Sequence, residues 1–385
     1  MPSLHTPSRR RFLRYASCAI ALPLPGWALA QTSPPPGRLI VIFLRGGLDG
    51  LFAISPVAAP QLASLRPTLS RTVLAEGIAL GNSGFSAHPA CAALAELYNQ
   101  RELAFAPCFG TNDRSRSHFQ AQDIFELGTG QSSGPSGWLA RAAQSGNRPG
   151  QVIGFSANQP LALQGETQIE LMPLSGSALQ LRHDRALAAI RAMHDGQSTG
   201  AAIEQAIHTQ SMLDEAGGMD VKAARGAAGV AGFPKAAENM ARILRSPPRF
   251  SMAFIDLGGF DTHASQESSL ARSLPKLCEG LLTLRDGLGR TEWARTQILL
   301  CSEFGRTVRE NGTQGSDHGH GGLACLIGGS IAGGRMLGDF PGLENRVLNE
   351  QRDLPVTLDW RKLIAQMLQE TQGFSNRRLQ QILPT

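Results

Sequence analysis

Five short apolar runs recur along the chain, and each is bounded by polar or glycine-rich residues. They cover residues 39–44, 103–108, 250–257, 297–302 and 323–327. A continuous apolar run of this length is typical of a strand buried on both faces, as in a mostly parallel sheet. Apolar positions at helical spacing lie between the runs, at residues 89–101, 119–127, 234–244, 267–288 and 358–368. Strands alternating with helices predict an α/β fold, a doubly wound, mostly parallel sheet sandwiched by helices.

Two segments lie outside this pattern. Residues 183–247 are rich in alanine and poor in buried-strand patterns, so we expect a helical insertion or cap there. Residues 31–37, QTSPPPG, predict a proline-rich leader. The folded α/β domain is therefore expected to span residues 38–385.

Residues 1–30 have the pattern of a twin-arginine signal peptide. An arginine triplet at residues 9–11 precedes the apolar residues 19–24, and Ala-Leu-Ala at 28–30 predicts cleavage before Gln31. Pro23 and Pro25 interrupt the apolar segment, so a lasting membrane anchor is not expected. We expect export by the twin-arginine (Tat) translocase, processing by signal peptidase, and a periplasmic or secreted protein. A basic disordered tail is the alternative interpretation.

The excess of basic residues belongs largely to this signal. Residues 1–30 hold four of the 36 basic residues and no acidic one, so 32 basic and 31 acidic residues follow, a formal net charge of +1. No long basic run interleaved with aromatic residues remains after residue 30. The sequence therefore favours a near-neutral protein that does not bind nucleic acid.

Polar residues gather where the predicted strands end. Asp261 and His263 follow the third run, and Glu303 and Arg306 follow the fourth. The glycine-rich segment GSDHGHGG, which carries Asp317, His318 and His320, precedes the fifth. Because ligands bind beyond the carboxyl ends of strands in open α/β sheets, these residues predict a metal or acid–base site. Helix capping by Asp261 and His263, and a simple ion pair between Glu303 and Arg306, are the structural alternatives.

A further polar segment, residues 111–118, follows the second run. It leads through His118 into the predicted helix, where the hydroxyl of Ser117 or Ser115 could act as a nucleophile or bind an anion, or simply cap the helix. Asp49, which follows the first run, is a candidate ligand or a turn residue. The GxSxG elbow, the P-loop and the HExxH zinc helix are absent from the sequence.

The motifs RGGLDG, SRSHFQAQDIFE, GGFDTHASQ, SEFGRT and GSDHGHGG follow one another in this order. In this the chain resembles the twin-arginine-exported "domain of unknown function 1501" family across nearly all residues after the signal. That family resembles the alkaline phosphatase and sulfatase superfamily, so the resemblance implies an alkaline-phosphatase-like sheet with a metal-assisted hydrolytic site at its edge. The chain departs from the superfamily pattern in three places. Arg45 follows the first strand where an aspartate is usual, the spacing from Asp261 to His263 is shorter, and Glu303-Phe304 replaces an Asp-His pair.

The resemblance implies a role for each candidate residue. The implied metal-binding residues are Asp49, Asp261, His263, Glu303, Asp317, His318 and His320. The implied catalytic residues are Ser117, His118 and Arg306, with Ser117 as nucleophile and Arg306 orienting an anion.

Three hypotheses follow. The first is a hydrolase of phosphate or sulfate esters that depends on a divalent metal such as Zn, Ca, Mg or Mn. The second is a catalytically degenerate binding or assembly protein, whose polar edge holds an anion, a glycan or a partner chain. The third is a metal-free hydrolase that uses Ser117 with His118 or His320. An anionic small molecule or a glycan is the expected substrate.

Overall fold

The computed structural model describes residues 37–145, 152–156, 158–165, 169–174, 227–245 and 250–384. The predicted signal, the leader up to residue 36 and residues 183–226 of the predicted insertion lie outside the described residues. Among the residues that are described, no helix combines the length and apolar character needed to cross a bilayer.

A ten-stranded sheet forms the centre of the domain, in the order β12-β5-β11-β10-β1-β9-β6-β7, with β13 beside β5 and β8 beside β9. All five predicted strands are present in it. The strands are β1 (Arg38–Leu44), β5 (Leu103–Gly110), β6 (Val152–Phe155), β7 (Glu170–Leu171), β8 (Ala228–Gly229), β9 (Met252–Gly258), β10 (Thr296–Cys301), β11 (Gly322–Ile327), β12 (Arg335–Met336) and β13 (Leu358–Asp359).

Strand direction places the loops that carry the candidate residues. Among the described pairings of this sheet, β11 is antiparallel to both of its neighbours, β10 and β5, and the other pairings are parallel. The start of β11 therefore lies at the same edge as the carboxyl ends of β1, β5, β9 and β10. The segment before β11 and the segments after the other four strands meet at this edge, as the sequence predicts for a mostly parallel sheet.

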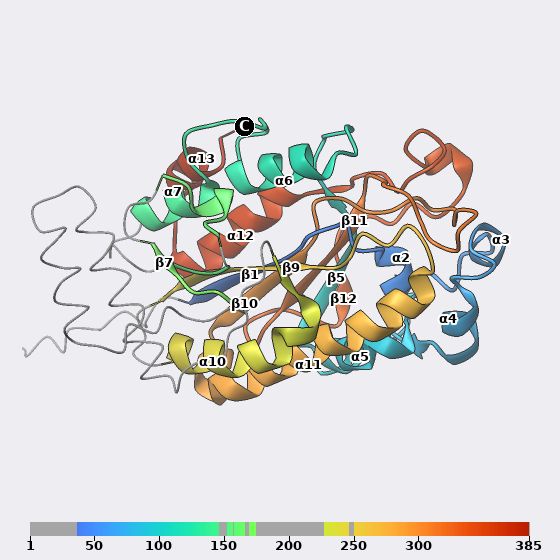
Figure 1. Cartoon of the computed structure of the whole chain (residues 1–385), viewed down its shortest axis with the longest axis horizontal. Coiled ribbons are helices and arrows are strands. Elements are labelled where there is room, and N and C mark those ends of the chain that lie inside the picture. Colours follow the sequence, from blue (N-terminus) through green and yellow to red (C-terminus); the bar gives the residue numbers. More distant parts are fainter. Residues whose placement is uncertain are drawn as a thin grey trace, which may run out of the picture. The chain divides into compact units, whose positions relative to one another are not determined.

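Helices cover both faces of the sheet (Figure 1). Alternate residues of β1 point to opposite faces, so Ile40 and Ile42 join one apolar core while Val41 and Phe43 join the other. The first core includes α5 (Ala92–Asn99), α10 (Phe233–Arg245) and α11 (Gln266–Trp293). The second includes α6 (His118–Leu127), α7 (Trp138–Ser145), α12 (Trp360–Gln372) and α13 (Asn376–Ile382). The predicted doubly wound α/β sandwich is confirmed.

The five predicted helices are present with shifted ends. The helix predicted at 358–368 begins at Trp360, because Leu358 and Asp359 pair with β5 and the Asp359 side chain caps α12. Helix α11 extends beyond the predicted residue 288, with non-helical backbone at Gly289. The described part of the predicted insertion comprises β8, η3 (Val230–Gly232) and α10, and α10 packs against α11 in the layer covering the sheet.

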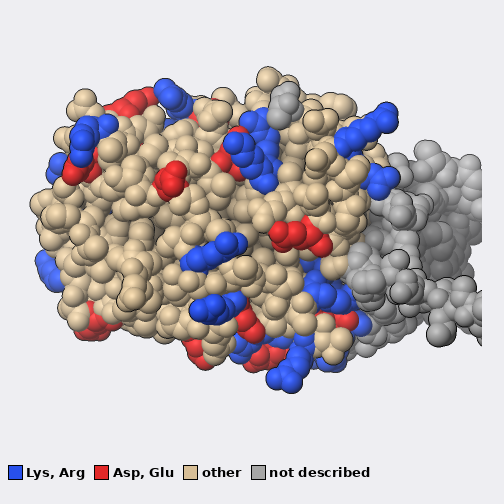
Figure 2. Space-filling view, turned by 180° about the vertical axis from the view of Figure 1, so that it is seen from behind, with Lys and Arg blue, Asp and Glu red and all other residues tan. Residues whose placement is uncertain are grey.

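Several short elements were not predicted. Residues between β1 and α5 form a small antiparallel sheet of β2 (Ile54–Ser55), β4 (Ser86–Ala87) and β3 (Ile78–Ala79), with α2 (Gly50–Ala53), α3 (Leu62–Leu65) and α4 (Arg71–Glu76). Short 3₁₀ turns are η1 (Pro89–Cys91), η2 (Leu161–Leu163), η3 (Val230–Gly232) and η4 (Asn345–Val347). Acidic and basic side chains are interspersed on the face shown in Figure 2, in keeping with the near-neutral formal charge of residues 31–385.

Candidate metal centre

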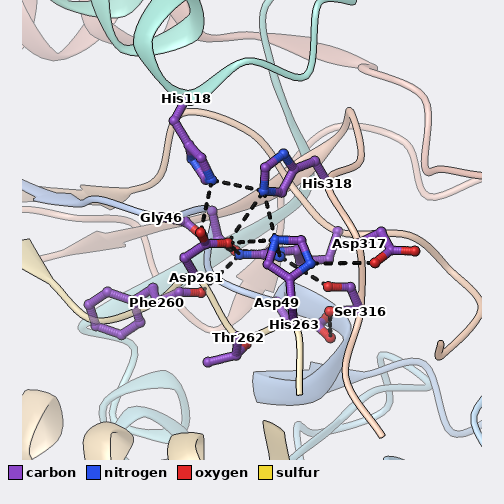
Figure 3. A network of polar contacts seen from close by, with 12 residues as sticks. Gly46, Asp49, His118, Phe260, Asp261, Thr262, His263, Ser316, Asp317 and His318 are labelled. Carbon is purple, nitrogen blue, oxygen red and sulfur yellow. Dashed lines mark hydrogen bonds and ion pairs between the residues drawn. The ribbon is translucent and has the colours of Figure 1, made fainter. Parts of the chain in front are cut away.

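Three histidines and one aspartate meet at this edge of the sheet (Figure 3). The Nε2 atom of His318 lies 2.8 Å from Nε2 of His118 and 2.9 Å from Nε2 of His263. Oδ1 of Asp261 lies 2.9 Å from Nε2 of His263 and 3.3 Å from Nε2 of His318, and Oδ2 lies 3.4 Å from Nε2 of His118. His118, Asp261 and His318 offer ligand atoms that all lie within 4.8 Å of one another. We call His118, Asp261, His263 and His318 the His/Asp cluster.

Local backbone structure brings these four residues together. The side chain of Ser117 accepts a hydrogen bond from the Gln120 N–H and caps α6, so the helix begins at His118. Gly46 has a positive φ of 112°, and a Cβ atom there would lie 2.5 Å from the backbone nitrogen of Asp261. The loop after β1 can therefore approach the loop after β9 only because Gly46 lacks a side chain.

Each histidine of the cluster uses its other ring nitrogen for an outward contact. His118 Nδ1 lies 2.7 Å from Oε1 of Glu303, and His318 Nδ1 lies 2.9 Å from the backbone oxygen of Arg116. His263 Nδ1 lies 3.4 Å from Oδ1 of Asp317. Ionised carboxylates and carbonyls only accept hydrogen bonds, so Nδ1 of each ring carries the proton.

In a neutral histidine that is protonated at Nδ1, the Nε2 atom carries a lone pair. In this cluster the three Nε2 atoms face one another and the Asp261 carboxylate. Lone pairs at 2.8 and 2.9 Å repel unless a proton or a metal ion lies between the two nitrogens. Imidazole nitrogens with one carboxylate oxygen, each imidazole held from behind by an acceptor, form a donor set typical of a transition-metal site. The described residues therefore provide a possible His/Asp metal site, and its chemistry fits such an ion.

The cluster is reachable from solvent. The side chains of Asp261 and His263 are 47% and 44% exposed, whereas those of His118 and His318 are 20% and 26% exposed. An open side is what a metal site needs in order to admit a substrate.

Charges around the cluster shift its pKa values in opposite directions. The hydrogen bond to Glu303 raises the pKa of His118. Burial and the charge of a protonated His118 lower the pKa of His318. Burial alone would raise the pKa of Asp261, but the hydrogen bond and charge of Arg306 outweigh it and lower that pKa. Asp261 is therefore held as a carboxylate beside a neutral His318.

Arg306 is engaged by the protein itself. Its side chain is fully buried and donates to Asp261 Oδ1 at 2.6 Å. It also donates to four backbone carbonyl oxygens, those of Gly46, Gly47, Phe260 and Ser316. Arg306 thus ties three loops together and holds Asp261 in place, and its donors are taken up by the protein rather than offered to an anion.

Glu303 supports the cluster from behind. Its side chain is buried, and Oε1 accepts hydrogen bonds from His118, from the Gly46 N–H and from the amide of Gln122, the last two at 2.9 Å. Burial would raise the pKa of Glu303, but the hydrogen bonds from His118 and Gln122 lower it. Gln122 was not among the sequence candidates, although its position one helical turn after His118 places both side chains on the same face of α6.

The other candidates lie outside the cluster. Asp317 contacts His263 from its outer side, and Ser117 caps α6. Asp49 is buried, where its Oδ2 accepts from Arg66 at 2.8 Å and from Gln266 at 2.6 Å. His320 is buried, burial lowers its pKa, and none of the described hydrogen bonds joins its side chain to the cluster.

The chain belongs to the family described as "Protein of unknown function (DUF1501)", whose model matches residues 109–383. The family resemblance expected from the motifs is therefore confirmed. A search of curated proteins found no match to this chain.

Solved structures similar to this chain include three proteins. One is a protein in the alkaline phosphatase superfamily from Vibrio parahaemolyticus, with 12% sequence identity and a TM-score of 0.39. The match covers 78% of this chain and 62% of the Vibrio chain. The second is a TAB5 alkaline phosphatase variant with Mg bound, with 12% sequence identity and a TM-score of 0.36. The match covers 76% of this chain and 91% of the phosphatase chain. The third is the C-terminal periplasmic domain of EcEptC from Escherichia coli, in complex with Zn, with 8% sequence identity and a TM-score of 0.44. The match covers 89% of this chain and 84% of the EcEptC chain. The chain thus spans less than two thirds of the Vibrio protein.

Proposed function

We propose that this protein is a metal-dependent hydrolase of phosphate or sulfate esters, with one divalent cation held by the His/Asp cluster. One observation carries the proposal: three Nε2 atoms converge on the Asp261 carboxylate while an acceptor holds each Nδ1 from outside. The nitrogen-rich donor set favours zinc over calcium, magnesium or manganese, which prefer oxygen ligands.

The bound cation would supply Lewis acidity toward an ester oxygen and lower the pKa of a nearby water molecule. The residues of the chain prepare the site for this chemistry. Glu303 keeps the proton of His118 on Nδ1, and Arg306 keeps Asp261 ionised. The hydroxyl of Ser117 caps α6. We therefore assign the attack to water rather than to Ser117.

Export belongs to the same proposal. The arginine triplet, the apolar segment and the Ala-Leu-Ala site of residues 1–30 support passage through the twin-arginine translocase and cleavage by signal peptidase. The protein would then act in the periplasm or outside the cell.

A second candidate function is a binding or assembly protein that has lost catalysis. It is favoured by Arg306, whose donors are taken up by carbonyl groups and Asp261, so that this guanidinium is not offered to an anionic ester. In this case the cluster would hold a cation or an anion without turnover.

Metal analysis of the exported protein tests the proposal. We expect about one zinc ion per chain by inductively coupled plasma mass spectrometry. His318→Ala should abolish binding, whereas His320→Ala should retain the metal, because His320 lies two residues away but outside the cluster. Equal metal content in both variants would refute the metal centre.

Activity assays separate the two candidate functions. The metal-loaded protein should hydrolyse 4-nitrophenyl phosphate or 4-nitrophenyl sulfate, and chelation should remove this activity. A metal-loaded protein that hydrolyses neither ester between about pH 5 and 9 would favour the binding protein.

A further inference from the structure

A hollow lies at the start of α6, the helix that begins at His118 of the His/Asp cluster. Its volume is about 410 Å³, within the range of about 300–1,000 Å³ that is usual for small-molecule sites. Segments that follow β5, the first turns of α6 and the start of α12 surround it. Its lining includes Thr111, Asn112, Gln120, Thr129, Gln131 and Arg361.

The lining is rich in neutral hydrogen-bonding groups. Five of the ten lining residues carry hydroxyl or amide groups, and apolar atoms, among them those of the buried Ile124 and Trp360, contribute as much of the lining surface as polar atoms do. The charged lining residues are already partnered: Arg361 pairs with Asp359 at 3.0 Å, and Asp113 accepts from Gln120 at 3.0 Å. This mixture of neutral hydrogen-bonding groups and apolar surface suits a ligand that has both hydroxyl groups and an apolar face.

Helix geometry connects this hollow with the cluster. Successive residues of an α-helix are rotated by about 100°, so the first three residues of α6 point in different directions. His118 points into the cluster and Gln120 lines the hollow. Ala121 is buried toward the core. Phe119 lies between His118 and Gln120 in the helix, so its side chain points to the solvent side between the cluster and the hollow.

Phe119 is unusually exposed. Its side chain is 83% accessible, and the other large hydrophobic residue that is exposed in the described part of the chain is Leu74, at 46%. Because single exposed apolar residues are common, the exposure of Phe119 is informative only through its position on α6 between His118 and Gln120, where an aromatic ring can contact a ligand.

We propose that Phe119 and the hollow form a saccharide-binding subsite. The hollow's amides and hydroxyls would bind sugar hydroxyl groups, and the ring of Phe119 would pack against the apolar C–H face of a sugar. A chain of sugars lying across the start of α6 reaches from the hollow to the cluster. This assignment deepens the proposed function, on which it rests for the reaction itself, because it makes the substrate an ester carried on a glycan.

Binding of neutral trisaccharides tests the subsite separately from the metal chemistry. Maltotriose, cellotriose and chitotriose are titrated against the full chain, with and without EDTA, by saturation-transfer NMR and calorimetry. We expect at least one to bind in both conditions. Phe119→Ala and Gln120→Ala should each weaken binding by about five- to ten-fold.

The controls are matched to each change. Leu74→Ala removes the other exposed apolar side chain, and Gln366→Ala removes an exposed glutamine of α12 outside the hollow, so both should leave binding unchanged. Adenosine serves as an aromatic ligand that is not a glycan chain. Sugar binding that is absent at about 10 mM, or unaffected by Phe119→Ala, overturns the subsite, and so does adenosine binding in place of the sugars. Metal content and aryl-ester hydrolysis are measured on the same samples, so the subsite and the hydrolase proposal fail separately.

Discussion

The contacts behind the histidines lead to a graded prediction. Glu303 and Asp317 play the same part for two different histidines, but Glu303 is buried at 2.7 Å from His118, whereas Asp317 is 52% exposed at 3.4 Å from His263. Glu303→Gln and Asp317→Asn each replace a carboxylate by an amide of the same shape. The two variants therefore compare one chemical change in a dry and a wet environment.

The structure sets the size of each effect. Replacing a residue that orients a metal ligand typically weakens metal binding about 10–100-fold, and we expect this range for Glu303→Gln. Oε2 of Glu303 is buried without a hydrogen-bond partner, so an NH₂ group placed there would be unsatisfied and cost about 1–3 kcal/mol of stability. Water screens the contact of Asp317, so Asp317→Asn should weaken binding by less than about threefold.

Competition with a chromophoric chelator gives the zinc affinity of each variant, and thermal unfolding with and without EDTA gives its stability. The reasoning would be refuted if Asp317→Asn weakened zinc binding as much as Glu303→Gln does. It would equally be refuted if Glu303→Gln left the zinc affinity unchanged.

Four further outcomes are expected. Asp49→Ala leaves the buried Arg66 without its carboxylate and should lower the free energy of unfolding in urea by about 3–5 kcal/mol. Burial alone would raise the pKa of Asp49, but Arg66 and Gln266 hold that pKa below the ordinary value of 3.8. The ionised Asp49 therefore stabilises the folded state fully above about pH 4, and this contribution is lost as the pH falls through the folded-state pKa. Urea unfolding of the wild type should therefore weaken more steeply below about pH 4 than that of Asp49→Asn. Gly46→Ala should cost about 1–3 kcal/mol and displace Asp261, which would show as weaker zinc binding in the chelator assay. The double variant Arg9→Lys, Arg10→Lys should remain in the cytoplasm as the precursor, which cell fractionation measures. The exported wild-type protein should begin at Gln31 on N-terminal sequencing.

The pattern of apolar runs was sufficient to predict the main strands, the main helices and the edge where chemistry gathers. Buried strands leave a continuous apolar signal, and the polar residues that follow them stand out against it. The polar segments that carry His118, Asp261, His263 and His318 were all identified in this way. The short strands β6 and β7 were not predicted, because runs of four and two residues give too weak a pattern.

The roles of neighbouring residues depended on contacts that the sequence does not encode locally. His318 and His320 stand two residues apart, yet only His318 reaches the cluster. Backbone contacts direct this segment: Gly305 donates to the His320 oxygen at 3.0 Å, and Gly319 donates to the Gly305 oxygen at 2.8 Å. Arg306 likewise follows its strand as an anion-binding residue would, but carbonyl groups from distant loops take up its donors.

The direction of β11 has a consequence for how the centre is assembled during synthesis. His318 contacts His118 across 200 residues of chain, and its position depends on β11 pairing between β5 and β10. A nascent chain therefore lacks a complete set of ligands until most of the domain has been made. Metal acquisition would follow the assembly of the sheet rather than guide it, and the ion would then cross-link segments from distant parts of the chain.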